Sequence, residues 1–158
     1  YLDTDVELLK KPDFLLENQC YIGIQQPESL CTTGLGFGAQ KSSPVVQKMM
    51  ECYDSISFTD QKKSTFACPW LNDKVIRSFG KVSNEDITYL KEVTVYPPRF
   101  FDPLSTGNTK NLLCDETVSI HHYAATWAGN KQRWKRKLIR FFGEDRYFKL
   151  KKLFRRVQ

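Results

Sequence analysis

The chain has 158 residues, 41% of them hydrophobic and 13% aromatic, which is sufficient for the core of one domain or part of one and argues against wholesale disorder. No run of about 18 apolar residues occurs, so the sequence predicts no membrane-spanning helix. The five cysteines include no Cys-x-x-Cys pair. This argues against structural zinc and a disulfide framework, and favours reduced thiols in a cytoplasmic protein.

The net charge of +6 is distributed unevenly along the chain. Residues 130–158 contain 12 Lys/Arg and 2 acidic residues, whereas residues 1–129 contain 12 Lys/Arg and 16 acidic residues. Such asymmetry predicts two parts with different roles: a body that binds cations, residues 1–129, and a basic tail, residues 130–158.

The first predicted element is a strand over Tyr1–Val6 that carries two acidic residues, Asp3 and Asp5. Side chains two positions apart on a strand point to the same face, so the two carboxylates are expected to converge. Like charges in such proximity are unfavourable unless a positive charge lies between them. A hard divalent cation such as Mn²⁺ or Mg²⁺ suits these oxygen ligands.

Other interpretations of this acidic pair can be compared with the sequence. An EF-hand calcium loop starting at Asp3 needs glycine and glutamate where Leu8 and Phe14 stand. A phosphatase-type nucleophile motif needs Thr or Val where Glu7 stands. A solvated surface turn or strand edge remains the alternative to a metal site.

The segments that follow alternate between strand and helix patterns. β-branched and apolar runs predict strands, and apolar residues at helical spacing after Ser-Pro or Cys-Pro predict helices. The expected elements are a short turn at 14–16, a strand at 20–24, a glycine-rich segment at 32–39, helices at 44–53 and 68–79, and strands at 93–96 and 117–123.

Glycine occupies every second position from Gly34 to Gly38. Two interpretations stay open: direct contact with a ligand, which glycine permits, or a strand packed tightly against its neighbours. A dinucleotide-binding fingerprint is disfavoured, because the next predicted helix begins only at Ser43 and Pro44 rather than within the glycine run.

Two adjacent histidines end the last predicted strand. Alternation places Thr117, Ser119 and His121 on one face, with His122 on the other. A neutral imidazole can bind manganese or donate to a diphosphate oxygen, while a single histidine is more often a structural residue.

The tail from residue 130 has a helical pattern in which aromatic and leucine residues alternate with Lys and Arg. Three interpretations compete: helices that cap the core, an anchor on an anionic membrane surface, and a contact with nucleic acid. Binding to nucleic acid is disfavoured because no recognisable binding module is present.

Three segments together resemble the DXD-containing sugar transferases of glycosyltransferase family 32. They are residues 1–7 (Tyr-Leu-Asp-Thr-Asp-Val-Glu), residues 33–39 (Thr-Gly-Leu-Gly-Phe-Gly-Ala), and residues 119–123 (Ser-Ile-His-His-Tyr) with Trp127. The resemblance implies an α/β GT-A fold, in which helices flank a mixed sheet. It also implies that the chain is the C-terminal part of a longer protein, with its sheet incomplete at the N-terminus.

The same resemblance implies a metal-dependent, retaining transferase that moves a sugar from a UDP- or GDP-sugar to a glycan or lipid-linked acceptor in polysaccharide synthesis. It implies that Asp5 binds Mn²⁺ or Mg²⁺ directly and that Asp3 binds it through water or contacts the ribose. His122 is the preferred third ligand and His121 its alternative.

The residues implied to bind substrate are Thr33, Gly34, Gly36, His121 and Trp127. Family members usually carry Asn where Thr32 stands, which is a departure from the pattern. A cytoplasmic enzyme, peripheral on the inner face of the membrane through residues 130–158, is expected. The alternatives are an inactive fragment that acts as a binding module and a nucleic-acid-binding domain.

Overall fold

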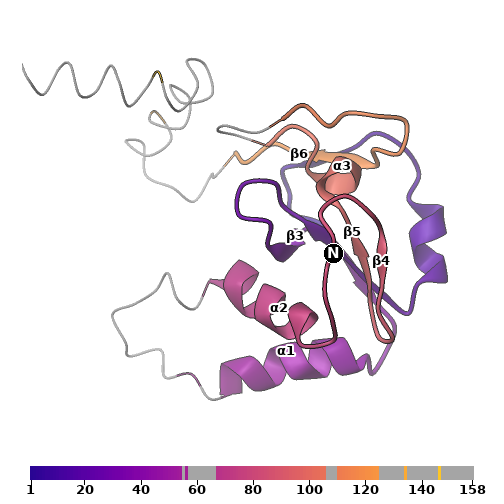
Figure 1. Ribbon diagram of the computed structural model, residues 1–158, viewed down its shortest axis with the longest axis vertical. Helices are drawn as coiled ribbons and strands as arrows, with labels where there is room; N and C mark the ends of the chain where they lie inside the picture. The colour runs from indigo at the N-terminus through magenta and orange to yellow at the C-terminus, as the bar shows by residue number, and fades with distance from the viewer. Residues whose placement is uncertain (55, 57–66, 106–109, 125–133, 135–145, 147–158) are drawn as a thin grey trace, which may run out of the picture.

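The computed structural model of this protein describes residues 1–54, 56, 67–105, 110–124, 134 and 146. Within them the fold is a small mixed α/β arrangement, as the sequence predicts (Figure 1). The strands are β1 (Val6–Leu8), β2 (Cys20–Ile24), β3 (Cys31–Ala39), β4 (Thr88–Tyr89), β5 (Thr94–Tyr96) and β6 (Ser119–His121). The helices are α1 (Pro44–Asp54), α2 (Cys68–Arg77) and α3 (Pro98–Phe101), with a 3-10 turn η1 at Asp13–Glu17.

The main sheet has the strand order β3-β2-β5-β4 and is mixed. Strand β2 is antiparallel to β3 and parallel to β5, and β4 is antiparallel to β5. Ile22 and Ile24 of β2 are fully buried. A strand that reads as a continuous apolar run is typical of the buried centre of a sheet.

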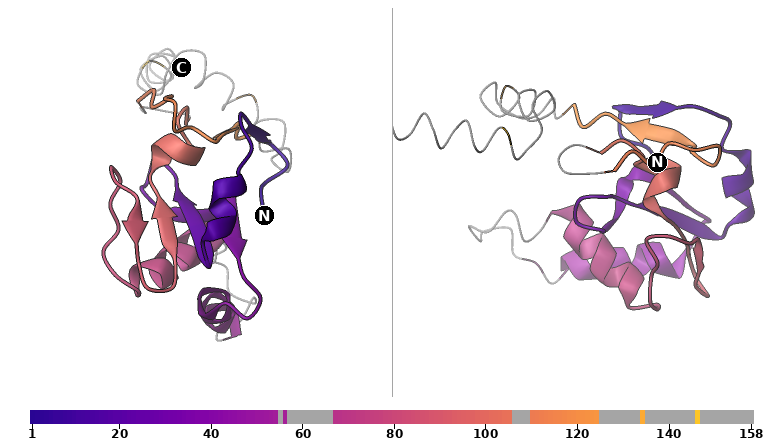
Figure 2. Two further views of the ribbon diagram at one scale, coloured as in Figure 1. Left: turned by 90° about the vertical axis from the view of Figure 1, so that its right-hand side faces the viewer. Right: turned by 45° about the horizontal axis from the view of Figure 1, so that its top comes forward.

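Helices α1 and α2 pack against this sheet and form the larger core with it. Val45 of α1 and Ile76 of α2 are both fully buried beside the β2 and β5 side chains. Figure 2 shows the two helices together at one end of the described part, with α3 and β6 at the opposite end. Proline stands in the first turn of α2, where a missing N–H costs nothing.

A second, aromatic core joins the sheet to β6. Phe100 and Phe101 of α3 pack with Tyr96 and with Val118, which precedes β6. The Val118 N–H donates to the Phe100 carbonyl at 2.8 Å. Strand β6 therefore takes its position from α3, and through α3 from the main sheet.

The first residues of the chain differ from the strand predicted over Tyr1–Val6. Tyr1 and Asp3 instead run beside β3, where Asp3 N donates to Gly34 O at 2.9 Å and Phe37 N donates to Tyr1 O at 3.0 Å. The chain then turns, with Val6 N donating to Asp3 O at 3.1 Å, and continues as β1. The predicted single strand is therefore wrong, because a turn separates two short extended stretches.

Most other predicted elements agree with the structure. The glycine-rich segment lies in β3, and β2, α1 and α2 fall where they were expected. None of the five cysteines, all of which lie among the described residues, forms a disulfide. Apart from residues 134 and 146, the predicted tail at 130–158 lies outside the described residues.

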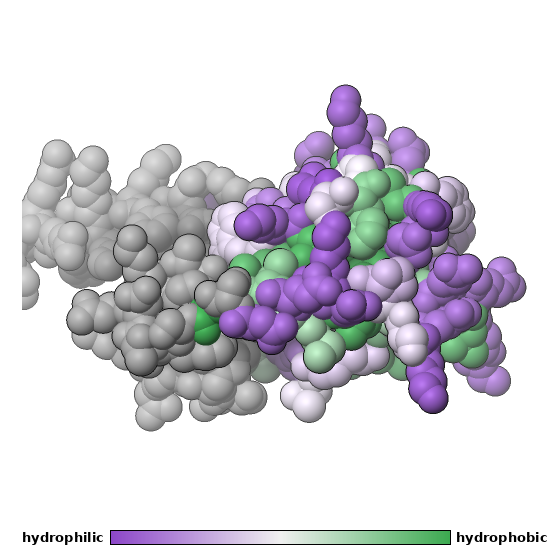
Figure 3. All heavy atoms as spheres, turned by 90° about the horizontal axis from the view of Figure 1, so that it is seen from below, coloured by the Kyte–Doolittle hydropathy of each residue, from purple (hydrophilic) through white to green (hydrophobic). Residues whose placement is uncertain are grey.

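No helix among the described residues is long and apolar enough to cross a membrane. The face of the molecule that carries α1 is covered largely by hydrophilic side chains, with smaller apolar patches between them (Figure 3).

Candidate metal centre

A cavity of about 480 Å³ lies where the N-terminal segment, β3, the start of α2 and the end of β6 meet. Most of the predicted site residues line it together with residues from segments far apart in sequence. The lining residues include Asp3, Asp5, Thr32, Thr33, Gly34, Cys68, His121 and Tyr123.

Two carboxylates and one imidazole converge in this cavity. The possible ligand atoms of Asp3, Asp5 and His121 all lie within 4.8 Å of one another. Nε2 of His121 is 3.1 Å from Asp5 Oδ1 and 3.7 Å from Asp3 Oδ2. The His121 side chain is only 10% exposed, against 22% for Asp5 and 40% for Asp3. The imidazole is therefore the most buried of the three groups, and the Asp3 carboxylate is the one most accessible to solvent.

Backbone contacts explain how residues so far apart in sequence come together. Strands β1 and β6 pair antiparallel with Val6 opposite His121, which places the turn containing Asp5 beside the end of β6. His122 N then donates to Asp5 O at 2.9 Å, and Ala124 N donates to Asp5 Oδ2 at 2.7 Å. The position of Asp5 is thus fixed by the segment that carries the histidine.

Asp3 is held from the opposite side, by β3 and by Tyr1. The Tyr1 hydroxyl donates to Asp3 Oδ1 at 2.8 Å, and this hydrogen bond to the carboxylate raises the pKa of Tyr1. A Cβ on Gly34 would lie 2.4 Å from Asp3 Oδ2, so the carboxylate occupies the space that a side chain at position 34 would fill. Glycine at this position is therefore explained by close approach to an acidic side chain.

The donor set fits a divalent cation. Both ring nitrogens of His121 are buried and make no hydrogen bond of standard geometry within the described residues. Buried polar atoms are usually paired, and a bound cation would satisfy a ring nitrogen that faces Asp5 Oδ1 at 3.1 Å without a hydrogen bond of standard geometry. Two carboxylate oxygens and one imidazole suit Mn²⁺ or Mg²⁺, and three protein ligands leave positions for water or phosphate oxygens.

The structure brings His121, rather than the preferred His122, to the aspartates. His122 points to the other side of the ribbon, where its Nε2 lies 2.8 Å from Glu7 Oε2. Alternation along a strand puts neighbouring residues on opposite faces, and the β1–β6 register decides which of the two faces the acids. The preferred histidine, His122, is therefore not the one beside the acids; that place is taken by His121, which was predicted as its alternative and as a substrate-binding residue.

The other predicted substrate-binding residues divide into three cases. Thr33 and Gly34 line the cavity, and Thr33 Oγ1 also accepts from Asn72 Nδ2 at 3.3 Å. Gly36 is absent from the cavity lining, and a Cβ there would meet the Phe101 ring at 3.3 Å. Trp127 lies outside the described residues.

Two aromatic residues of the cavity were missed as site residues. Tyr1 belongs to the acidic motif itself, and its contact with Asp3 joins side chains two positions apart on one extended stretch, which alternation puts on the same face. Tyr123 packs against the ring of His121, with centroids 4.1 Å apart. Its place directly after the histidine pair was the one signal in the sequence that could have drawn attention to it.

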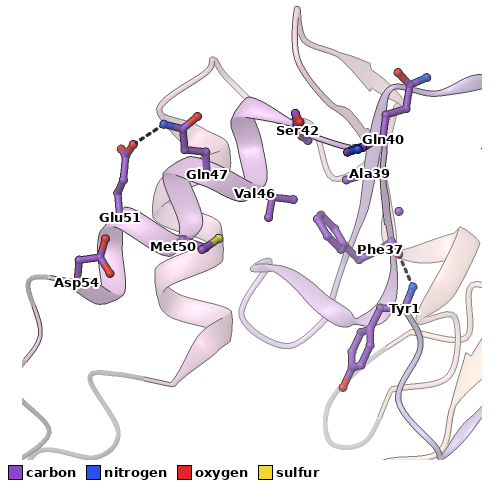
Figure 4. A pocket seen from close by; sticks show the side chains of 13 residues that line it. Tyr1, Phe37, Ala39, Gln40, Ser42, Val46, Gln47, Met50, Glu51 and Asp54 are labelled. Atoms are coloured by element: carbon purple, nitrogen blue, oxygen red, sulfur yellow. Dashed lines mark hydrogen bonds between the residues drawn. The ribbon is translucent and has the colours of Figure 1, made fainter.

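A larger hollow of about 1030 Å³ lies between β3 and α1, with Phe37 and Val46 directed toward it (Figure 4). Its lining is mixed, with the amides Gln40 and Gln47 beside exposed acidic residues of α1. Within the described residues the Asp3–Asp5–His121 cluster is the group placed to hold an ion. The smaller cavity is therefore the candidate centre.

Comparison with family models, with curated proteins and with solved structures found no match to this chain. The resemblance to family 32 therefore stays a prediction from the sequence. The centre itself is defined by its geometry: two acids and an imidazole, from opposite ends of the described chain, at one wall of a cavity.

Proposed function

We propose that this chain belongs to a metal-dependent glycosyltransferase of GT-A type that moves a sugar from a UDP- or GDP-sugar to a glycan or lipid-linked acceptor. Asp3, Asp5 and His121 hold Mn²⁺ or Mg²⁺ in this role. The observation that carries this function is the convergence of these three side chains at the cavity. The family resemblance of the segments that contain them supports the same conclusion.

Asp3, Asp5 and His121 would hold the metal, which when bound would supply Lewis-acid stabilisation of the departing diphosphate. The chain's own residues fix the ligands before substrate arrives. Ala124 N–H orients the Asp5 carboxylate, Tyr1 O–H orients that of Asp3, and burial restricts the imidazole of His121. Preorganised groups of this kind need no rearrangement at the moment of reaction.

The donor has room beside the ligands. Gly34 and Thr33 line the cavity next to Asp3, and Cys68 and Pro69 at the start of α2 line it as well. A mixed sheet with a parallel β2–β5 pair and helices against it is compatible with a GT-A core. The basic segment 130–158 is the part proposed to contact an anionic membrane surface that presents the acceptor.

The test uses the complete protein and a panel of UDP- and GDP-sugars, with hydrolysis measured with and without Mn²⁺. Asp5→Asn and His121→Ala are expected to remove the Mn²⁺-dependent activity. His122→Ala is the matched control, since it deletes the neighbouring imidazole on the other face and is expected to keep most of the activity. Mn²⁺-dependent hydrolysis that survives Asp5→Asn refutes the function.

The alternative, a metal-binding module without transferase activity, rests on the same cluster. It predicts tight Mn²⁺ binding that Asp5→Asn and His121→Ala abolish, with no hydrolysis or transfer for any donor in the panel. The two functions thus differ in turnover and agree in metal binding.

A further inference from the structure

Tyr123 has a backbone conformation that needs external support. Its φ is 49°, in the left-handed region that aromatic residues seldom adopt. Residues in such regions persist where their surroundings fix them, and they cluster at functional sites. The Tyr123 hydroxyl donates to Asp102 Oδ2 at 2.8 Å, which supplies one such restraint.

Asp102 is a rigid anchor for that hydroxyl. It follows α3 and is fully buried, and the same Oδ2 accepts the Gln26 N–H at 2.8 Å. The Gln26 side chain in turn donates to the carbonyls of Asp102 at 2.9 Å and Pro103 at 3.1 Å.

Tyr123 contacts one of the proposed metal ligands and is followed in the chain by the residue that orients another. The Tyr123 ring meets the His121 ring edge to face, at 4.1 Å between centroids and 80° between planes. The next residue, Ala124, donates its N–H to Asp5 Oδ2. A change in the position of Tyr123 is therefore transmitted to two of the three ligand side chains.

We propose that Asp102 and Tyr123 form a positioning clamp that holds the His121 imidazole and the Asp5 carboxylate in the geometry that binds the metal. The clamp rests on the metal centre of the proposed function. Neither residue is a ligand: Asp102 anchors the tyrosine hydroxyl, and Tyr123 orients the imidazole through its ring and Asp5 through the adjoining N–H. Outer groups that orient metal ligands commonly change metal affinity when they are removed.

The test compares Tyr123→Phe with Tyr96→Phe in the complete protein. Tyr96 is a buried tyrosine away from the cavity, and its hydroxyl accepts a hydrogen bond from Asn18 Nδ2 at 3.1 Å. Each variant thus loses one hydrogen-bonded hydroxyl and keeps its ring. Mn²⁺ affinity is measured by electron paramagnetic resonance of the free ion, and stability by thermal unfolding.

We expect both variants to lose similar stability, while Tyr123→Phe alone weakens Mn²⁺ binding, by roughly tenfold. A second readout needs no metal: in ¹⁵N-histidine spectra the His121 and His122 imidazoles are assigned from the signals that disappear in His121→Ala and His122→Ala. Tyr123→Phe is expected to shift the His121 signals, and Tyr96→Phe to leave them in place.

The outcomes separate the clamp from the proposed function. Unchanged Mn²⁺ affinity and unchanged His121 signals in Tyr123→Phe overturn the clamp while the transferase function stands. Mn²⁺ binding that depends on Tyr123 without turnover of any nucleotide-sugar supports the clamp and overturns the transferase. A wild-type protein that binds no Mn²⁺ overturns both.

Discussion

Replacing Gly34 by alanine tests whether Asp3 is a metal ligand without touching Asp3 itself. The added Cβ would lie 2.4 Å from Asp3 Oδ2, and ordinary contact begins at 3.4 Å, so the oxygen must withdraw by about 1 Å. The Asp3 side chain is 40% exposed and can rotate toward solvent. The strain is therefore relieved by loss of the acid from the cluster, and the fold remains intact.

The expected magnitudes differ for binding and for stability. Displacing one of three protein ligands should weaken Mn²⁺ binding at least roughly tenfold, which equals about 1.4 kcal/mol. Alanine restricts the unfolded chain more than glycine does, and this stabilising effect offsets the small cost of moving the exposed Asp3 side chain. The free energy of unfolding should therefore change by less than about 1 kcal/mol.

Gly36→Ala is the matched control, two positions further along β3. Its Cβ would meet the Phe101 ring at 3.3 Å, and Phe101 is only 1% exposed, so this variant should lose about 1–3 kcal/mol of stability and keep its Mn²⁺ affinity. Metal affinity is titrated by electron paramagnetic resonance and stability by denaturant unfolding. A folded Gly34→Ala variant that binds Mn²⁺ as tightly as the wild type refutes the assignment of Asp3.

Two further predictions concern the buried acids outside the centre. Asp73 Oδ1 accepts the buried Cys31 N–H at 2.9 Å, so Asp73→Ala should lower the free energy of unfolding, measured with denaturant, by about 1–3 kcal/mol. Its salt-bridge partner Arg77 is half-exposed, so Arg77→Met should lower the free energy of unfolding by less than about 1 kcal/mol. Equal losses would contradict this division. Burial raises the pKa of Asp102 in the folded state above the ordinary aspartate value of 3.8, so the folded state binds the proton more tightly than the unfolded state does. Wild-type stability relative to Asp102→Asn should therefore fall as pH rises above about 4 and level off once the folded pKa is passed, which unfolding of both proteins between pH 4 and 7 measures. A relative stability that rises over this range would show that the sign is wrong.

The elements that the sequence predicts well are those with local signals. The bounds of β2 follow from an apolar, partly β-branched run, and α1 begins at the proline that suits a first helical turn. The convergence of Asp3 and Asp5 was also predicted, though for another reason. The prediction rests on alternation along a single strand, whereas in the structure a turn between two short extended stretches brings the two carboxylates together.

The features that the sequence could not determine depend on long-range pairing. Alternation separates His121 from His122, but only the β1–β6 register, with Val6 opposite His121, decides which imidazole meets the acids. That register joins segments 115 residues apart and is fixed by α3, which positions β6. The anchoring of Tyr123 by Asp102 likewise has no signature in either local sequence.

Asp3 and Asp5 have fewer compensating partners than the acidic residues Asp73 and Asp102 outside the centre. Asp73 shares its charge with Arg77 and an N–H, and Asp102 receives an N–H and an O–H on the same oxygen. Asp3 and Asp5 lie together, and within the described residues the basic side chain that faces both of them is the imidazole of His121. Two carboxylates in such proximity are unfavourable without a compensating positive charge. The fold nevertheless fixes both beside the imidazole, through Tyr1 and Ala124, and a bound divalent cation is the charge that would make this arrangement favourable.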